Sequence, residues 1–488
     1  MTTDISIDTP EWVKDAVFYQ IFPDRFARSD QVAKPTNLEP WDAAPTRHGF
    51  KGGDLMGVVE RLDYLQDLGI NAIYFNPIFQ STANHRYHTY DYYQVDPILG
   101  GNEAFQRLIE AAHQRSMRIV IDGVFNHASR GFFQFNHILE NGPHSPYLDW
   151  FIVNGFPLNA YTEDEAPNYA AWWNLPDLPK LNTDNDRVFE FLMAVAEHWI
   201  REGIDGWRLD VPLDIKTPGF WETFRQRCKA VNPEAYIVAE IWEQGADWLQ
   251  GEHFDGVMNY VLNRACLGFF GGRSLDTSYH PGGFHIAPLD GPAFADTVER
   301  AMDTIPWPIT LTQLNLLSSH DMPRFLTLVH GDTRRTKLAV LFQMTFPGAP
   351  CIYYGDEIGL PGRRDPDNRR AFPWDEAQWD TDLRDWFRRC IALRHDHAAL
   401  RRGTFERLYA AESAYVFARN LDGTTLVAAF NAGESAVTLQ IPLPECVADL
   451  GAVEDIFSAR SHPIEDGSIR LAMPALSGTL LHCVEDAE

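Results

Sequence analysis

Short apolar segments alternate with amphipathic stretches along most of this chain, and this alternation constrains the fold more than any other feature. Eight of the short segments are rich in β-branched and aromatic residues: 16–23, 70–77, 118–127, 203–211, 236–242, 256–260, 311–321 and 350–357. Strands that are apolar almost throughout are typical of a parallel sheet covered on both faces. The pattern therefore predicts an α/β protein built on a parallel sheet.

Helical periodicity separates most of these segments. Residues 186–202 place apolar side chains along one stripe, with Asp184 or Asn185 as the N-cap, and residues 55–69 and 103–116 show the same period. Eight strands alternating with helices over roughly 350 residues predict a (β/α)8 TIM barrel that carries insertions. An open doubly wound sheet is the alternative, but no glycine-rich phosphate loop follows the first strand.

Two regions depart from the strand–helix repeat. Residues 128–185, between the third and fourth strands, are too many for a loop and a helix, and they predict a small inserted subdomain over the barrel mouth. After about residue 398 the pattern changes to short alternating strands with turn signals. The chain is therefore divided into a barrel (1–127 and 186–398), an inserted subdomain B (128–185) and a C-terminal all-β sandwich (399–488).

Composition excludes several classes of partner. The formal net charge of −27 repels phosphate backbones and anionic lipid, and no basic run offsets it, so we expect no nucleic-acid or membrane partner. No stretch reaches the ~18 apolar residues of a membrane helix. The six cysteines are scattered without a C-x-x-C pair, which disfavours a disulfide framework or a zinc site. Since no signal peptide is visible, we expect a cytoplasmic protein.

Polar residues concentrate where the predicted strands end. The third strand ends at Asp122, the fourth carries Arg208 and Asp210, the fifth ends at Glu240, and the seventh ends at His320 and Asp321, while Asp356 and Glu357 follow the eighth. Taken singly, each could be a helix cap, a core histidine or an internal salt bridge. Because the carboxyl ends of barrel strands form one rim, their joint occurrence predicts an active site there.

Four of these segments carry a family resemblance. The sequences "DGVFNH" (122–127), "GWRLD" (206–210), "VAEIW" (238–242) and "LLSSHD" (316–321) resemble, in order and spacing, the four short motifs of the α-amylase family of retaining glycosidases. Further segments resemble its neopullulanase, cyclomaltodextrinase and maltogenic amylase branch: "YQIFPDRF" (19–26), "NHRYHTYDYYQVDPILGG" (84–101), "WW" (172–173) and "LPKLN" (178–182).

The resemblance implies roles for individual residues. Asp210 would be the nucleophile, Glu240 the general acid and then base, and Asp321 a third carboxylate that grips sugar hydroxyls; a retaining glycosidase holds its two reacting carboxyls ~5–5.5 Å apart. Arg208 would keep Asp210 ionised. The other substrate-binding positions implied are Tyr87, His127, His320, Trp242, Asp365 and Arg369, and Trp242 is equally compatible with ordinary core packing.

Three departures from the branch shape the functional expectation. The barrel pattern starts near residue 11, whereas members of the branch carry an N-terminal β domain, so dimer formation and a preference for cyclic dextrins stay open. The segment 211–214 reads Val-Pro-Leu-Asp where the branch has Val-Ala-Asn-Glu, which leaves linkage preference open. The calcium loop has lost most oxygen ligands, and Arg28 or Lys34 would supply the positive charge instead.

These observations together predict a hydrolase of α-1,4 and possibly α-1,6 glucosidic bonds. Its substrates would be maltodextrins, cyclodextrins or pullulan, with some transglycosylation. The alternatives are an exo-acting α-glucosidase or oligo-1,6-glucosidase, and a catalytically inactive sugar-binding homologue. We expect no required cofactor or metal, although calcium stays possible, and a monomer or weak homo-oligomer.

Overall fold

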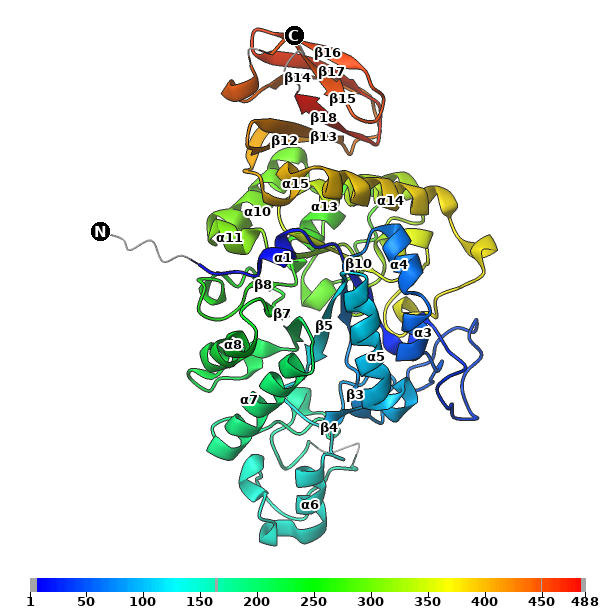
Figure 1. Cartoon of the computed structure of the whole chain (residues 1–488), viewed down its shortest axis with the longest axis vertical. Coiled ribbons are helices and arrows are strands. Elements are labelled where there is room, and N and C mark those ends of the chain that lie inside the picture. The colour runs from blue at the N-terminus through cyan, green and yellow to red at the C-terminus, as the bar shows by residue number, and fades with distance from the viewer. Residues whose placement is uncertain (1–6, 163–165, 449, 484–488) are drawn as a thin grey trace, which may run out of the picture.

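The computed structural model describes most of the chain, namely residues 7–162, 166–448 and 450–483. Residues 1–6, which belong to the N-terminal segment where no signal peptide was expected, lie outside the described residues. So do residues 163–165 of the predicted subdomain B and residues 449 and 484–488 of the predicted sandwich. Along the long axis of the molecule the C-terminal β domain occupies one end, the barrel lies in the middle, and the region around α6 (Phe133–Asn141) forms the other end (Figure 1). Within the described ranges, no helix combines the length and the apolarity needed to cross a membrane.

The centre of the molecule is a parallel barrel. Its strands among the described residues are β1 (Phe18–Ile21), β2 (Ala72–Phe75), β5 (Arg118–Gly123), β6 (Gly206–Leu209), β7 (Tyr236–Ala239), β8 (Gly256–Val257), β9 (Leu314–Leu316) and β10 (Ala349–Tyr353). They lie in the order β8-β7-β6-β5-β2-β1-β10-β9, and each bonds to its neighbours in parallel. A parallel bridge between Met258 and Leu314 joins the two ends. The predicted (β/α)8 barrel is confirmed, and the open sheet is excluded.

Helices surround the barrel as the periodicity predicts. The longer ones are α5 (Gly101–Gln114), α7 (Asp186–Arg201), α8 (Phe220–Val231), α9 (Tyr260–Gly271), α10 (Gly291–Asp303), α13 (Thr333–Thr345) and α14 (Thr381–Asp396). Asn185 caps α7, because its side chain accepts from the backbone N–H groups of Arg187 and Val188. The stretch 55–69, predicted as one helix, is instead two, since the chain breaks between α3 (Leu55–Val59) and α4 (Leu62–Leu68).

Shorter elements complete the barrel region. They are α1 (Glu11–Lys14), α2 (Pro23–Phe26), α11 (Trp307–Thr310), α12 (Phe325–Leu328) and α15 (Ala398–Arg402). The antiparallel pair β3 (Phe79–Ser81) and β4 (Thr89–Val95) lies between β2 and α5, and the sequence analysis did not anticipate it. The hairpin brings residues 82–88, including Tyr87, to the rim of the barrel.

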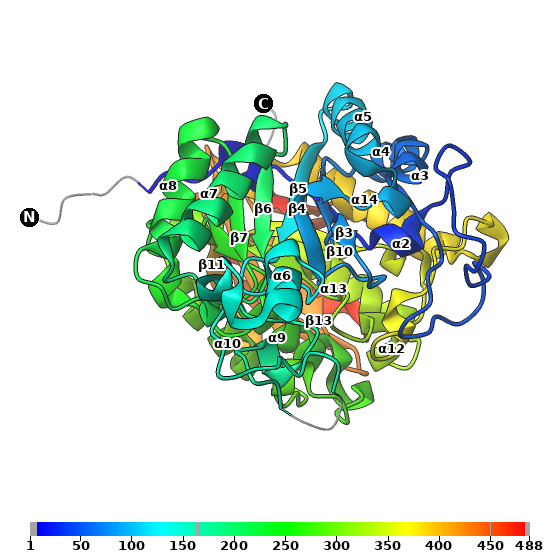
Figure 2. The same ribbon diagram turned by 90° about the horizontal axis from the view of Figure 1, so that it is seen from below.

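The insertion after β5 is tied to the rim by backbone pairing. Isolated bridges join His127 to Lys180 and Phe151 to Leu181, so both ends of the insertion lie beside the end of β5. Seen from below, α6 and the loops around it lie in front of the barrel strands (Figure 2). The insertion therefore covers the end of the barrel at which the strands terminate.

The C-terminal region is an antiparallel β domain, as predicted for a sandwich. Its strands in the described part are β11 (Glu406–Ala411), β12 (Ala414–Leu421), β13 (Thr424–Asn431), β14 (Val437–Pro442), β15 (Ala452–Asp455), β16 (Ser461–Glu465), β17 (Ser468–Met473) and β18 (Ser477–Cys483). Alternate residues of β12 point to different cores. Val416 packs within the β domain against residues of β14 and β17, whereas Tyr415 and Phe417 pack on the barrel side, against Phe342 of α13.

Candidate active site

Strand register explains why the predicted residues meet. In the pairing of β5 with β6, Asp122 lies opposite Arg208, and in the pairing of β6 with β7, Leu209 lies opposite Ala239. Asp210 and Glu240 each follow these last residues, so they emerge at the same level on adjacent strands. The parallel barrel therefore delivers both carboxyls to one place on its carboxyl-terminal rim.

Arg208 stands at the centre of this group. Its side chain is fully buried, and its Nη1 atom donates to both carboxylate oxygens of Asp122, at 2.9 and 3.0 Å, and to Oδ1 of Asp210 at 3.1 Å. Its Nη2 atom lies 3.1 Å from Oε2 of Glu240. One guanidinium thus contacts three carboxyls, whereas the sequence predicted a role towards Asp210 alone.

Crowding of acids has a predictable effect on their protonation. Burial raises the pKa of Asp210 well above its usual range, and the negative charge of Glu240 raises that pKa further against the opposing pull of Arg208. Burial likewise raises the pKa of Asp122. Because neighbouring carboxyls titrate as a coupled set, this group retains protons that an isolated aspartate would have lost at neutral pH.

Glu240 is held from two further sides. Its Oε1 atom accepts from the indole N–H of Trp242 at 3.0 Å, and its Oε2 atom accepts from the backbone N–H of Val211 at 3.1 Å. Trp242 in turn stacks on Tyr260, with ring centroids 3.7 Å apart and planes 6° from parallel. Trp242 therefore touches the predicted acid directly and fixes the direction of its carboxyl group.

A hydrogen-bonded chain forms the opposite wall. Gln20 donates to Nδ1 of His320 at 2.9 Å, so Nε2 of that ring carries the proton, and Nε2 lies 2.6 Å from the hydroxyl oxygen of Tyr87. The Tyr87 hydroxyl donates to Asp122 at 2.9 Å. The Tyr87 and His320 rings are stacked, with centroids 5.6 Å apart and planes 9° from parallel. Burial lowers the pKa of His320 well below its usual range, so the ring is neutral.

Asp321 joins the group from the loop after β9. Its Oδ2 atom lies 3.2 Å from Nε2 of His320, and Arg369 approaches its Oδ1 atom at 3.7 Å. Burial, with the charge of Glu240 adding to it, raises the pKa of Asp321 to about 7. Arg369 also pairs with Asp365 at 3.1 Å, so these two predicted residues lie together beside Asp321.

His127 occupies a position between the barrel and the insertion. The ring is buried, its Nδ1 atom lies 3.2 Å from the side-chain amide of Asn126, and its Nε2 atom has no hydrogen-bond partner among the described residues. Burial lowers the pKa of His127 to about 3, so the ring stays neutral at working pH. An unpaired ring nitrogen in a buried position is available to a ligand hydroxyl.

Comparison with known proteins identifies the family to which this arrangement belongs. Residues 20–406 match the catalytic domain of the alpha amylase family. The chain belongs to that family. It is a glycoside hydrolase, and the resemblance drawn from the four motifs is confirmed.

Individual relatives of this alpha-amylase family member match over most of its length. A cyclomaltodextrinase of Bacillus sp is 43 % identical over 435 residues, which is 88 % of this chain and 75 % of the relative. A solved structure from Thermus thermophilus is 49 % identical, with a TM-score of 0.93, covering 97 % of this chain and 100 % of the other. A debranching enzyme of Nostoc punctiforme is also 49 % identical, with a TM-score of 0.90, and covers 98 % of this chain and 100 % of the other.

Two acids at the end of β10 do not join the group in this family member. Asp356 pairs with Arg324 at 2.7 Å, and Glu357 accepts from the hydroxyls of Tyr19 at 2.8 Å and Tyr64 at 2.6 Å. Both carboxyls are thereby engaged away from Arg208. Their position at a strand end made them candidates, but their partners are those of structural residues.

Sequence reasoning missed several residues that shape the site. Gln20 links His320 to Asn76 on the next strand, since its side-chain amide also donates to Asn76 at 3.0 Å, and Asn76 donates to Tyr87 at 3.2 Å. Tyr74 donates to Asp122 at 3.0 Å. A polar residue within an apolar strand, as Gln20 is within "FYQI", was the available signal.

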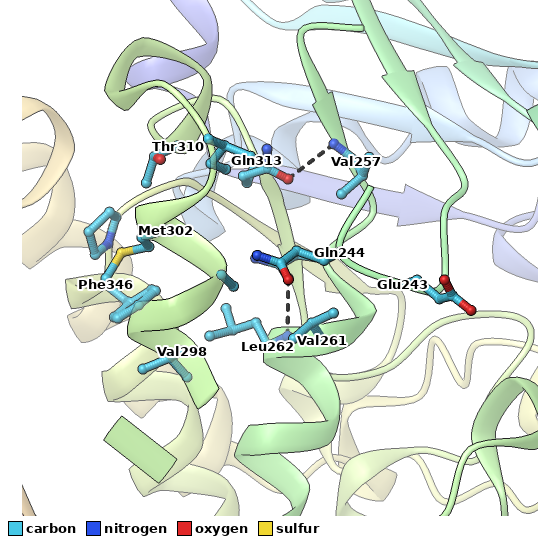
Figure 3. A pocket seen from close by; sticks show the side chains of 14 residues that line it. Glu243, Gln244, Val257, Val261, Leu262, Val298, Met302, Thr310, Gln313 and Phe346 are labelled. Atoms are coloured by element: carbon cyan, nitrogen blue, oxygen red, sulfur yellow. Dashed lines mark hydrogen bonds between the residues drawn. The ribbon is translucent and has the colours of Figure 1, made fainter. Parts of the chain in front are cut away.

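A small cavity lies away from these residues, behind the loop that follows Glu240. Its volume is about 20 Å³, enough for about one water molecule. Side chains of α9 and α10, including Leu262, Val298 and Met302, surround it, together with Gln244 (Figure 3). None of the predicted site residues lines it, so it is a packing defect beside the site.

The loop in which the family resemblance implied a calcium site holds an ion pair in this chain. The Lys34 ammonium lies 2.7 Å from Oδ2 of Asp54, and the same carboxylate accepts from the backbone N–H and the hydroxyl of Ser29, both at 2.8 Å. In the part of the chain that the structure describes, no group of three or more His, Cys, Asp or Glu side chains is placed to hold a metal ion. A cation already sits on the best remaining ligand, so these residues do not fit calcium.

Proposed function

We propose that this family member hydrolyses α-1,4 glucosidic bonds, and α-1,6 bonds as a second activity, in maltodextrins, cyclodextrins and pullulan, with retention of configuration. The supporting observation is the placement of Asp210 and Glu240 at one level on adjacent strands, both within 3.1 Å of one guanidinium. That arrangement suits two carboxyls acting on opposite sides of one glycosidic bond. The names of the relatives agree with such substrates.

The proposed first step breaks the glycosidic bond. Asp210 attacks the anomeric carbon while Glu240 transfers its proton to the departing oxygen, giving a covalent glycosyl–Asp210 ester and a free sugar hydroxyl. A proton is available within the group because burial and neighbouring charges raise the pKa values of Asp210, Asp122 and Asp321. As positive charge develops at the anomeric carbon, it favours the ionised form of Asp210, which is the form that attacks.

The second step releases the sugar. Glu240, now a carboxylate, removes a proton from water, which attacks the anomeric carbon and displaces Asp210. Two inversions restore the α configuration. A sugar hydroxyl in place of water would give transglycosylation by the same step.

The other side chains bind and orient the ring. Asp321, the neutral His320 and the neutral His127 can exchange hydrogen bonds with ring hydroxyls, and Tyr87 presents an aromatic face beside them. Arg369 and Asp365 border this pocket. Trp242 holds Glu240 and offers an apolar wall next to it.

The test of the mechanism uses stereochemistry and one substitution. Proton NMR of the first product released from maltotriose should show the α anomer, and a β anomer would overturn a retaining mechanism. Asp210→Asn should lower kcat by at least about 10³-fold, since the nucleophile is lost, while calorimetry still detects maltooligosaccharide binding. Asp365→Asn, at the half-exposed edge, is the matched control and should lose far less. Full hydrolysis by Asp210→Asn would sink the assignment.

Product analysis tests the proposed substrates. Digestion should give maltose with glucose from maltotriose, short malto-oligosaccharides from β-cyclodextrin, and panose-type fragments or short malto-oligosaccharides from pullulan. Glucose alone from short substrates would favour the exo-acting α-glucosidase alternative. Binding without any hydrolysis would favour an inactive homologue.

Three further expectations stand as proposals. We infer that the enzyme needs no divalent cation, because Lys34 neutralises Asp54. A cytoplasmic location is supported by the cysteines, all of which are free within the described residues. A monomer or weak homo-oligomer stays a prediction, and light scattering after size-exclusion chromatography measures it.

A further inference from the structure

Large hydrophobic side chains are unevenly exposed on this molecule. Among residues 7–162, 166–448 and 450–483, those that stand out in solvent all belong to the inserted subdomain: Phe133, Ile152, Phe156, Tyr161, Trp173 and Leu175. Trp173 is the most exposed, at 77 %. Exposed hydrophobics scattered over a surface are ordinary, but their restriction to the one subdomain over the active site indicates contact with a ligand or partner.

The backbone holds Trp173 outward at an energetic cost. Trp173 has φ +49° and the following Asn174 has φ +58°, two consecutive non-glycine residues in the left-handed region. This region is sterically unfavourable for residues other than glycine. Because the outward side chain of Trp173 gains little stability from burial, this strained backbone indicates that the residue is placed there for function and not for folding.

Trp173 is the outer member of an aromatic column that begins inside the site. Its ring stacks on Trp172 at 4.3 Å, with planes 11° from parallel, and Trp172 stacks on His127 at 5.2 Å and 21°. His127 is the buried ring whose Nε2 atom has no partner among the described residues. The column therefore runs from the predicted sugar pocket to the outer surface of the inserted subdomain.

The inner part of the column is also fixed to the loop after the predicted nucleophile. The indole N–H of Trp172 donates to Oδ2 of Asp214 at 3.0 Å, and Lys180 donates to the backbone carbonyl of the same residue at 3.1 Å. Asp214 lies on the segment that begins with Val211, whose N–H binds Glu240. The column thus stands beside the acid, on the side where the leaving-group sugars would lie.

We propose that the outer face of Trp173 is a remote sugar-binding platform, on which a glucosyl ring of a bound chain stacks beyond the catalytic pocket. This inference rests on the proposed function and adds a preference for longer chains. The apolar C–H face of a pyranose matches an indole face, and the parallel rings of the column place that face outward. A single tryptophan face is far smaller than the ~1,200 Å² of a stable protein interface, which favours a sugar over a second copy of the chain.

The experiment compares chain lengths. For Trp173→Ala, kcat/KM on maltoheptaose should fall about five- to tenfold, mainly through KM, because a platform binds ground state and transition state alike. The loss on maltotriose should be at least fivefold smaller. Trp173→Phe should restore most of the difference, since it keeps an aromatic face. Tyr161→Ala is the matched control: Tyr161 is 70 % exposed in the same subdomain, but its ring is covered by Arg130 rather than stacked in the column.

Every outcome decides between the explanations. Equal losses on both substrates, or no loss on maltoheptaose, overturn the platform while leaving the proposed function intact. Absence of α-glucan hydrolysis by the unmodified enzyme overturns the proposed function itself. A change in molar mass by light scattering in Trp173→Ala, without a change in the length ratio, would assign the face to a second copy of the chain and overturn the proposal. As a direct readout, the fluorescence of Asp210→Asn should shift to the blue on adding maltoheptaose, and this shift should shrink in Asp210→Asn/Trp173→Ala.

Discussion

Two groups of buried carboxylates in this molecule are built in opposite ways. At the barrel rim, three carboxyls converge on the single guanidinium of Arg208. In the loops near the start of the chain, Asp24 pairs with Arg25 at 2.6 Å and accepts from two backbone N–H groups, and Asp54 pairs with Lys34 and accepts from Ser29 and Gly57. Each carboxylate in the second group therefore has a cation of its own.

The difference separates a reacting site from a structural one. Matched charges with all lone pairs used keep a loop in place and leave no group free to react. Unmatched carboxyls raise one another's pKa values and hold protons near neutral pH, which is what proton transfer to a leaving group requires. The carboxyls at the rim therefore lower the stability of the folded protein, and the size of that loss can be measured in variants.

The largest expected effect comes from removing the shared cation. Arg208→Leu leaves Asp122, Asp210 and Glu240 buried without their partner, and should cost about 3–5 kcal/mol of stability at pH 7. The loss should shrink towards pH 4, because Asp122 and Asp210, whose pKa values are raised, become protonated there, and kcat should fall at least about 10³-fold. Thermal unfolding followed by circular dichroism between pH 4 and pH 8 measures it. A stability loss independent of pH would show that Arg208 acts by packing alone.

A smaller loss is expected in the matched group. Lys34→Met removes the cation from Asp54 but leaves the hydrogen bonds from Ser29 and Gly57, so the variant should lose about 2–3 kcal/mol with activity per folded molecule unchanged. Lys14→Met, which breaks an exposed pair with Glu11, is the control and should change stability by under about 1 kcal/mol. Adding EDTA to the unmodified enzyme should leave its Tm unchanged; a lower Tm would contradict the proposal that the enzyme needs no divalent cation.

The smallest effect has the opposite sign. Because the folded protein raises the pKa of Asp321 to about 7, the unfolded chain releases its proton first as pH rises from about 4, and stability falls until pH 7. Asp321→Asn cannot ionise, so it should gain on the order of 1–2 kcal/mol relative to the unmodified enzyme across that window and level off above it.

Calorimetric Tm values at pH 4, 5.5, 7 and 8.5 measure this gain. Asp54→Asn is the counterpart from the matched group, and it should be less stable than the unmodified enzyme at pH 7 because its ion pair with Lys34 is lost. A decrease in Tm for Asp321→Asn at pH 8.5 would show that Asp321 is stabilised as a carboxylate, and the proposed difference between the two groups would fail.

The barrel could be predicted from sequence because its signals are local. Apolar strands such as 118–123 and amphipathic helices such as 186–201 carry their own period, whatever they pack against. The hairpin of β3 and β4 escaped because its pairing is irregular, with register shifts at Phe79 and Gln80. The break near Glu60 within 55–69 escaped because both halves keep an apolar stripe.

The sequence predicted which residues form the site but not the contacts between them. Strand ends named Arg208, Asp210 and Glu240, yet only the register of three strands shows that one guanidinium contacts Asp122, Asp210 and Glu240 together. Gln20 and Asn76 join the site through contacts between segments far apart in the sequence. The outward position of Trp173 depends on its left-handed backbone conformation, which the sequence Trp172-Trp173 does not predict.

The two-sided strand β12 limits how this enzyme can be miniaturised. Phe342 on α13 packs against Tyr415, Phe417 and Phe430. Removing everything after residue 405 would therefore expose the aromatic side chain of Phe342 on the outer surface of the barrel to solvent. A trimmed catalyst would be expected to aggregate unless those barrel positions were redesigned with polar side chains. Engineers seeking a shorter version should treat the terminal β module as part of the same cooperative folding unit as the barrel.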